Sequence, residues 1–302
     1  MIDILNLAPS TISRDLKGKY LLIYGEPKIG KTTLLSQLPK SLIMAFEPGT
    51  NAIDGAYIIP IRQWSDAKTV LKQLKTEQAK NKYDFIGIDT ADIAWELCEK
   101  YICTQNDVDT LGEIAWGKGF SMCAREFSDF FREIALLGYG ICFVSHESEK
   151  HFKDEKGEEY IKIAPALDKR PYGIVNKMVD IISYIRAVPD DNGVEKRYMF
   201  LRGNNKFLAG SRFKYIEPRI EFTYDDLVNA IYNAIDIQKE KDGAVITDET
   251  NRFYDEKEIR SFDEVRKEAE ELWVKILEND KENINKLNDI IDRKSTRLNS
   301  SH

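Results

Sequence analysis

The sequence of 302 residues is poor in cysteine and histidine, which excludes several classes of protein. Its four cysteines form no C-x-x-C pair, and its three histidines are too few to complete a zinc-ligand pattern. A small disulfide-stapled scaffold is excluded too, and the cysteine usage indicates a cytoplasmic setting. No run approaches the ~18 apolar residues of a membrane span. The first residues lack the basic start and apolar stretch of a signal peptide, so we expect no contact with a membrane.

Excess charge is also scarce over most of the chain. The net charge is −7, and residues 236–291 alone carry 17 acidic and 10 basic side chains. The preceding residues are therefore close to neutral. With 42% hydrophobic residues the chain can bury a large core. Bulk charge neither indicates nor excludes a nucleic-acid partner, because a basic groove can coexist with a neutral total.

Apolar runs and helical periodicities alternate through the first half of the sequence. Four runs lack a two-residue period, as expected for strands buried on both faces: 19–24, 42–46, 85–88 and 141–145. Apolar residues recur at helical spacing over 67–78 and 121–137. Strands separated by helices predict an α/β fold with a mainly parallel central sheet.

The pattern changes after Ser145. Residues 146–170 are polar and charged, which predicts a long loop. Apolar β-rich stretches follow at 178–188, 197–201 and 206–209, and a helix is expected over 224–235. Asn192-Gly193 and Gly203-Asn204 are typical of hairpin turns, so the sheet is predicted to end in an antiparallel extension.

The domain organisation follows from these patterns. We expect an N-terminal segment over 1–18, a core over 19–235, and an acidic linker with a C-terminal amphipathic helix over 236–291. Within the last segment the helix is predicted over 261–277, because Ser261 and Glu264 form a capping-box pattern. Residues 292–302 correspond to one reading frame of a common DNA-sequencing adapter, so we interpret them as a disordered artefact; a basic disordered tail is the alternative.

One motif carries a specific chemistry. Residues 25–32, Gly-Glu-Pro-Lys-Ile-Gly-Lys-Thr, match G-x-x-x-x-G-K-[ST] between a predicted strand and a predicted helix. Glycines allow successive backbone amides to turn towards phosphates, Lys31 supplies a positive charge, and the Thr32 hydroxyl can bind Mg²⁺. The motif therefore predicts an ATP site. Its expected binding residues are Gly25, Glu26, Pro27, Lys28, Ile29, Gly30, Lys31, Thr32 and Thr33.

Three further side chains are predicted to share the rim of this site, because parallel strands end at one edge of a sheet. Asp89 ends an apolar strand and is the second expected Mg²⁺ ligand, although an aspartate there can also cap the next helix. Glu47 ends the second strand and can orient water for attack, the alternative being an exposed turn residue. His146 ends the fourth strand and can sense the γ-phosphate, or be an ordinary packed residue.

This ordered set of residues resembles the core of RecA-type ATPases. More closely, it resembles compact phage-encoded nucleotide-binding proteins, grouped with AAA-type ATPases, that act as RecA-like single-strand annealing recombinases. The resemblance implies that Glu47 activates water and that His146 couples the nucleotide to two DNA loops, near 103–118 and 147–170. It also implies a homo-oligomer, with Lys206 or Arg212 reaching a neighbouring subunit's nucleotide as a trans-acting finger; a solvated basic hairpin is the alternative for that segment.

The combined prediction is an Mg²⁺-dependent ATPase. With Lys31, Glu47, Asp89 and His146 at the reacting phosphate, hydrolysis is expected to be coupled to single-stranded DNA in phage recombination, replication or repair, in the host cytoplasm. A single-strand site needs cations and stacking faces. The candidates are Lys118, Phe120, Lys150, Phe152, Lys153, Lys169, Arg170 and Tyr172. The alternative is a nucleotide-dependent switch or scaffold that binds protein partners; a small-molecule kinase would need an Arg-rich lid that the sequence does not suggest.

Overall fold

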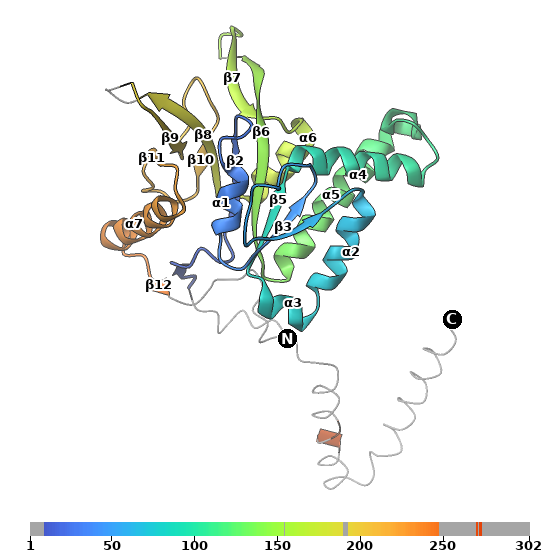
Figure 1. Ribbon diagram of the computed structural model, residues 1–302, viewed down its shortest axis with the longest axis horizontal. Helices are drawn as coiled ribbons and strands as arrows, with labels where there is room; N and C mark the ends of the chain where they lie inside the picture. The colour runs from blue at the N-terminus through green and yellow to red at the C-terminus, as the bar shows by residue number, and fades with distance from the viewer. Residues whose placement is uncertain (1–8, 154, 190–192, 248–269, 271, 274–302) are drawn as a thin grey trace. The chain divides into compact units, whose positions relative to one another are not determined.

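The computed structural model describes residues 9–247, apart from 154 and 190–192, together with residues 270, 272 and 273 (Figure 1). The chain divides into two compact units, Met1–Tyr254 and Asp255–His302. The expected helix over 261–277 and the expected artefact over 292–302 lie outside the described residues, except that Glu270, Leu272 and Trp273 are helical. Everything below concerns the first unit.

A mainly parallel sheet forms the centre of this unit (Figure 1). All four predicted core strands are present: β2 (Tyr20–Gly25), β3 (Ser41–Ala45), β5 (Phe85–Asp89) and β6 (Gly140–Lys153). They pair in the order β2-β6-β5-β3, and β4 (Tyr57–Pro60), which was not predicted, adds a parallel edge strand. The α/β prediction with a mainly parallel central sheet is confirmed, and one strand, β6, separates β2 from β5.

Helices cover both faces of the sheet because alternate residues of each strand point to opposite sides. Leu21 and Ile23 pack in one apolar cluster with α1 (Lys31–Gln37) and α7 (Tyr224–Asp242). Leu22 and Tyr24 pack in the other. That second cluster contains α2 (Trp64–Leu74), α4 (Ala91–Gln105) and α5 (Lys118–Leu136). The rigid sheet thus holds the strand ends in fixed relative positions.

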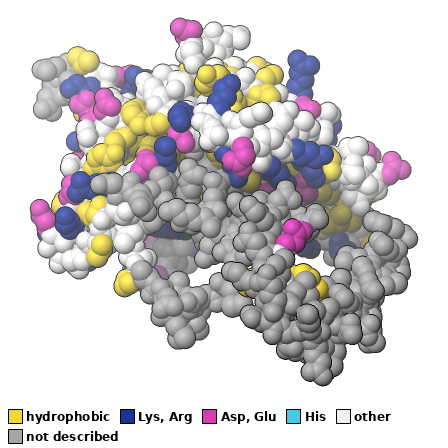
Figure 2. All heavy atoms as spheres, turned by 90° about the horizontal axis from the view of Figure 1, so that it is seen from below, with side chains coloured by type: hydrophobic (Ala, Val, Ile, Leu, Met, Phe, Trp, Pro, Cys, Tyr) yellow, Lys and Arg dark blue, Asp and Glu magenta, His cyan; other side chains and the backbone are white. Residues whose placement is uncertain are grey.

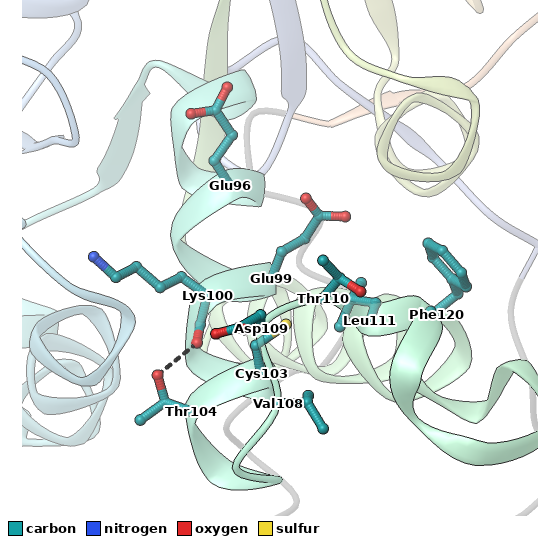
Figure 3. Close-up of a pocket in the computed structure, with 11 residues that line it drawn as sticks. Glu96, Glu99, Lys100, Cys103, Thr104, Val108, Asp109, Thr110, Leu111 and Phe120 are labelled. Atoms are coloured by element: carbon teal, nitrogen blue, oxygen red, sulfur yellow. Dashed lines mark hydrogen bonds between the residues drawn. The ribbon is translucent and has the colours of Figure 1, made fainter.

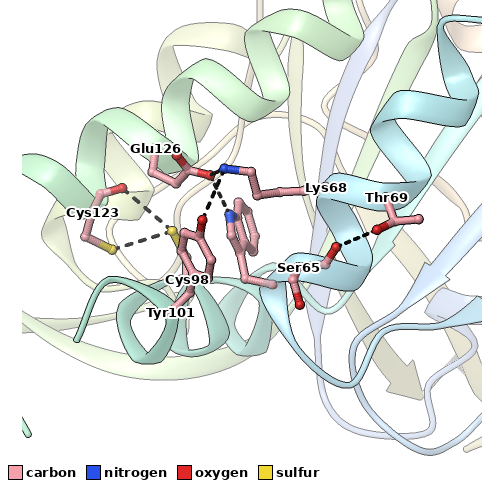
Figure 4. Close-up of polar contacts among 8 residues, drawn as sticks. Ser65, Lys68, Thr69, Cys98, Tyr101, Cys123 and Glu126 are labelled. Atoms are coloured by element: carbon pink, nitrogen blue, oxygen red, sulfur yellow. Dashed lines mark hydrogen bonds and ion pairs between the residues drawn. The ribbon is translucent and has the colours of Figure 1, made fainter. Parts of the chain in front are cut away.

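Aromatic rings dominate the core between α2 and α5. Trp64 is 1% exposed and packs against Phe127, Phe130 and Phe131. Its indole nitrogen donates to Glu126 at 2.9 Å. As Figure 4 shows, Lys68 donates to the same carboxylate at 2.8 Å, and the buried sulfurs of Cys98 and Cys123 lie 3.7 Å apart. These contacts join α2, α4 and α5 into one layer.

The prediction of a loop over 146–170 was wrong. Strand β6 continues to Lys153, and β7 (Glu159–Pro165) pairs with it antiparallel from Glu147↔Pro165 to Lys153↔Glu159. This hairpin extends beyond the rest of the sheet (Figure 1), and α6 (Lys169–Met178) follows it. The polar composition was misleading because a hairpin solvated on both faces needs no continuous apolar run.

The antiparallel extension is confirmed in outline. Strand β8 (Ile181–Pro189) pairs parallel with β2 and antiparallel with β9 (Glu195–Phe200), which pairs with β11 (Arg219–Glu221). The prediction of a strand over 206–209 was wrong. Phe207 forms an isolated β-bridge with Ile163, and the short strand β10 is Gly210–Ser211. Residues 202–209 instead turn back on themselves through backbone bonds such as Gly203 N to Ala209 O.

Several helix boundaries differ from the expected ones. The helix predicted over 67–78 is two helices, α2 and α3 (Glu77–Lys82), because Thr76 caps a new start. Helix α7 passes the expected boundary at Ile235 and ends at Asp242, where Gly243 adopts a φ of 69°. Beyond it β12 (Ile246–Thr247) pairs parallel with β1 (Ile12–Ser13).

On the face seen from below, neither positive nor negative charge dominates the part of the surface that the described residues form. Figure 2 shows Lys and Arg side chains interspersed there with Asp and Glu. Among the described residues, no helix combines the length and the apolar character needed to cross a bilayer.

Candidate nucleotide site and hairpin face

The phosphate-binding motif forms the turn between β2 and α1. Gly25 must be glycine because a Cβ there would lie 2.5 Å from the Ile185 carbonyl oxygen of β8. Gly30 precedes α1 with a φ of 111°, and Lys28 has a φ of 66°. These left-handed conformations fold the loop tightly, as required if its backbone amides are to converge on phosphate oxygens.

Lys31 and Thr32 project from the start of α1 towards the strand ends. The buried Lys31 ammonium donates to the carbonyls of Gly25 and Glu26, both at 2.7 Å, and burial lowers its pKa. The Thr32 hydroxyl donates to Asp89 Oδ2 at 2.7 Å. Burial raises the pKa of Asp89, and the Thr32 hydrogen bond and the Lys31 charge act in the opposite direction. The loop, one cation and one buried carboxylate are thus brought together as predicted.

The donor set fits Mg²⁺. Thr32 and Asp89 offer adjacent hydroxyl and carboxylate oxygens, and Mg²⁺ prefers oxygen ligands and retains several waters or phosphate oxygens. Among the described residues no group of three His, Cys, Asp or Glu side chains could enclose a metal ion. A cation at this position would therefore be shared with the phosphates of a nucleotide rather than held by the protein alone.

Glu47 and His146 meet at the same rim. The loop residue Gly25 lies opposite His146 in the β2–β6 register, and Phe46 N donates to the Asp89 carbonyl at 2.6 Å. His146 Nε2 lies 3.6 Å from Glu47 Oε1. Burial raises the pKa of Glu47, His146 is the strongest opposing influence, and Asp89 raises this pKa further. A half-buried carboxylate facing the phosphate loop can orient a water molecule.

Three residues at the site were missed by sequence reasoning. Asp92 Oδ2 accepts a hydrogen bond from His146 Nδ1 at 2.8 Å, and its place three residues after Asp89 was a usable signal. Glu147 follows His146, and burial raises its pKa while a hydrogen bond from Tyr184 opposes the rise. Arg197 of β9 donates to the Ile29 carbonyl at 2.9 Å. It is distant in sequence from the loop that it braces, so no local pattern could have found it.

Of the two expected trans-acting fingers, Arg212 is paired through its guanidinium within its own chain. Arg212 contacts Asp180 Oδ1 at 3.1 Å and the Lys177 carbonyl at 2.7 Å. Lys206 lies in the turn before β10, where its carbonyl accepts from Ile163 N at 2.8 Å. A role for either residue on a neighbouring subunit stays a prediction.

The first expected DNA loop, 103–118, borders a cavity of about 760 Å³ (Figure 3). Its wall contains Glu96, Glu99 and Asp109 beside one cation, Lys100. Burial raises the pKa of Glu99. Carboxylates that line a cavity repel phosphates, so this loop is poorly suited to a nucleic-acid backbone.

The second expected DNA loop is the β6–β7 hairpin, and its two faces differ. Successive strand residues alternate, so Lys150 and Phe152 share a face with their partners Lys162 and Tyr160. The Phe152 and Tyr160 rings stack at 5.8 Å, and the Lys162 ammonium lies over both. Carboxylates occupy the other face of the hairpin, at Glu147, Glu149 and Glu159. Glu147 and Glu149 thus lie on the face opposite the aromatic pair, whereas Glu158 and Glu159 line one cavity together with Tyr160.

Helices next to the hairpin extend this face. The Lys150 ammonium lies 5.9 Å from the centre of the Tyr172 ring of α6, and Arg170 lies 4.3 Å above the Phe120 ring of α5. We call this set the basic–aromatic face. Its members are Lys150, Phe152, Tyr160, Lys162, Tyr172, Arg170 and Phe120, with the exposed Lys169 beside Arg170. Lys153 was predicted to join it but points to the opposite face, where it pairs with Glu159 at 3.3 Å; Lys118 is exposed at the start of α5.

This chain is similar to known proteins in sequence and in structure. Residues 17–213 match a family model described as an AAA domain. The chain is 32% identical over 301 residues to the SPbeta prophage-derived uncharacterized protein YorG of Bacillus subtilis (strain 168), covering 97% of this chain and 90% of that protein. It is also similar to the flagellar accessory protein FlaH of Methanocaldococcus jannaschii, with a TM-score of 0.34 and 16% identity over 63% of this chain and 80% of the other. The chain belongs to the AAA-domain family of P-loop ATPases.

Proposed function

We propose that this protein is an ATPase whose Mg²⁺-dependent hydrolysis is coupled to single-stranded DNA bound on the basic–aromatic face. The observation that carries the proposal is the continuity of β6. Its residue His146 lies at the phosphate loop, and the same strand continues into the hairpin that carries Phe152. The similarity to a prophage-derived protein supports a phage setting, in which we expect a role in recombination, replication or repair in a bacterial cytoplasm.

The positions of the residues at the phosphate loop support hydrolysis of ATP. The loop amides and Lys31 would bind the β- and γ-phosphates, and Thr32 with Asp89 would hold Mg²⁺, which stabilises charge on the phosphate oxygens. Glu47 would orient the attacking water and remove its proton. Arg197 braces the loop from outside through the Ile29 carbonyl. Each group acts from the end of a strand or the start of a helix, so the arrangement is preorganised.

The DNA half of the proposal rests on two chemical features of the hairpin. Bases of any sequence stack on aromatic rings, and cations beside the rings contact the phosphates. The Phe152–Tyr160 stack flanked by Lys162 supplies both on one face. The carboxylates of the other hairpin face do not face the bound strand.

Steady-state ATP hydrolysis with and without an oligothymidylate tests the proposal. We expect DNA to stimulate the wild-type rate, and we expect Glu47→Gln to bind ATP but to lose turnover by about 10²–10⁴-fold. Asp54→Asn, an exposed carboxylate after the same strand, is the matched control and should keep wild-type rates. Normal hydrolysis by Glu47→Gln would overturn the assignment of the base. Hydrolysis indifferent to DNA would favour a nucleotide-dependent switch or scaffold that binds proteins.

A further inference from the structure

Asp92 lies on the side of the His146 ring opposite Glu47. In the first turn of α4, its Oδ2 is 2.8 Å from His146 Nδ1, whereas Nε2 of the same ring faces Glu47 Oε1 at 3.6 Å. A carboxylate only accepts hydrogen bonds, so it favours the form in which Nδ1 carries the proton. In the neutral ring this leaves the lone pair of Nε2 directed at Glu47.

We propose that Asp92 is a positioning residue that fixes the orientation and tautomer of His146, so that His146 receives the proton that Glu47 takes from the attacking water. This inference rests on the proposed ATPase function. The water oxygen bonds to the γ-phosphorus as one water O–H bond breaks, and the bond from the γ-phosphorus to the β–γ bridging oxygen breaks with its electron pair on ADP. The proton moves to Glu47 and then to Nε2, across a shortened contact or one bridging water.

The surrounding charges suit such a transfer. An imidazolium formed at His146 lies between the carboxylates of Glu47 and Asp92, and both ring N–H groups then have an acceptor. The other ionisable groups around this cluster are Lys31 of α1, Asp89 of β5 and Glu147 of β6. Two of these three are carboxylates, so they also favour a positive ring. Glu47 is returned to its ionised form, and the imidazolium gives its proton to the released phosphate or to solvent before the next turnover.

A purely structural role for Asp92 is the competing explanation. An acidic residue in the first turn of a helix stabilises it by about 0.3–1 kcal/mol. Asp92 Oδ1, however, is buried without a hydrogen-bond partner in the described part of the chain, so its carboxylate is committed to His146 through Oδ2 alone. If Asp92 only stabilised the helix, replacing it would change the melting temperature but not which nitrogen of His146 carries the proton.

Asp92→Asn separates the two explanations. The asparagine amide can donate to Nδ1 and so drive the proton onto Nε2, which then no longer accepts one. We expect kcat to fall about 10²-fold, with a changed pH profile and an unchanged KM for ATP. Glu96→Gln, an exposed carboxylate further along α4, is the control and should keep the wild-type kcat. In a His146→Ala background, Asp92→Asn should have no further effect.

Long-range ¹H–¹⁵N spectra of the histidine rings provide a readout that does not require activity. The His146 signal, assigned by its loss in His146→Gln, should show a protonated Nδ1 in the wild type and a protonated Nε2 in Asp92→Asn. An unprotonated Nδ1 in the wild type, or an Asp92→Asn kcat equal to that of Glu96→Gln, would overturn the inference. If the wild type hydrolyses no ATP, the proposed function fails, whereas the spectra still decide whether Asp92 sets the tautomer.

Discussion

Salt dependence offers a quantitative test of the basic–aromatic face. Each phosphate neutralised on a single strand contributes about −0.7 to the slope of log affinity against log salt. Lys162, Lys169 and Arg170 are available to contact phosphates, whereas the Lys150 ammonium already donates to the Leu167 carbonyl. Three contacts give a slope of about −2.1, so raising salt from about 50 to about 200 mM should weaken binding roughly 20-fold.

Removing one contact changes this slope by a known amount. Lys162→Gln should reduce the slope to about −1.4, so that the same salt increase weakens binding only about 7-fold. The matched control is Lys153→Gln, which removes the same charge from the opposite face of the hairpin, where Lys153 pairs with Glu159. Fluorescence anisotropy of a labelled oligothymidylate, measured at several salt concentrations with a non-hydrolysable ATP analogue, gives all three slopes.

The salt slopes of the two variants must differ if the strand binds to one face of the hairpin. Equal slopes for Lys162→Gln and Lys153→Gln would show that the strand is not bound to one face, and affinity independent of salt would show that phosphates are not contacted. The stacking component is tested separately by Tyr160→Ala, which should cost about 1–3 kcal/mol of binding free energy with little change in slope. If Tyr160→Ala changed only the salt slope and bound as tightly as the wild type at low salt, the stacking role would be contradicted.

Three further predictions concern the core and the nucleotide site. Arg197→Gln removes the donor to the Ile29 carbonyl. Because this arginine is exposed, the substitution should weaken ATP binding only about 5-fold, as measured by titration with a fluorescent nucleotide. Lys196→Gln changes the exposed neighbouring residue and should leave ATP binding unchanged. Phe131→Ala empties a fully buried position in the aromatic core and should lower the free energy of unfolding in urea by about 3–5 kcal/mol; a loss below about 1 kcal/mol would contradict the packing. Burial raises the pKa of Glu47, and a general base must be ionised to act. As the pH is lowered, kcat should therefore begin to fall at pH values above the ordinary glutamate range. A kcat that stays unchanged down to about pH 4 would refute this.

The sequence was sufficient where one physical signal dominated. Strands buried on both faces, such as β3 and β5, show as uninterrupted apolar runs, and the motif over 25–32 has a spacing that few other structures require. From these, parallel pairing alone predicted that Glu47, Asp89 and His146 share one rim. The fold class and the nearness of Thr32 and Asp89, both expected as Mg²⁺ ligands, were therefore predictable.

The sequence was insufficient where long-range contacts decide the structure. The hairpin over 147–165 carries polar residues on both faces, so its register depends on pairing rather than on an apolar pattern. Arg197 reaches the phosphate loop only because β9 is placed beside β8, which is placed beside β2. Neither arrangement leaves a periodic trace in the local sequence.

Strand β6 is the route by which we propose that a nucleotide and DNA bound on the hairpin influence each other. Its first half pairs with β2 on one side and β5 on the other, and its second half pairs with β7. The change occurs at His146 and Glu147, where Glu147 already pairs with Pro165 while His146 still lies opposite Gly25. A movement of His146 towards a phosphate or towards Glu47 therefore acts at the base of the hairpin. Coupling by this route requires the strand to remain intact, so a proline at Ser148 should leave ATP binding in place while removing any stimulation by DNA.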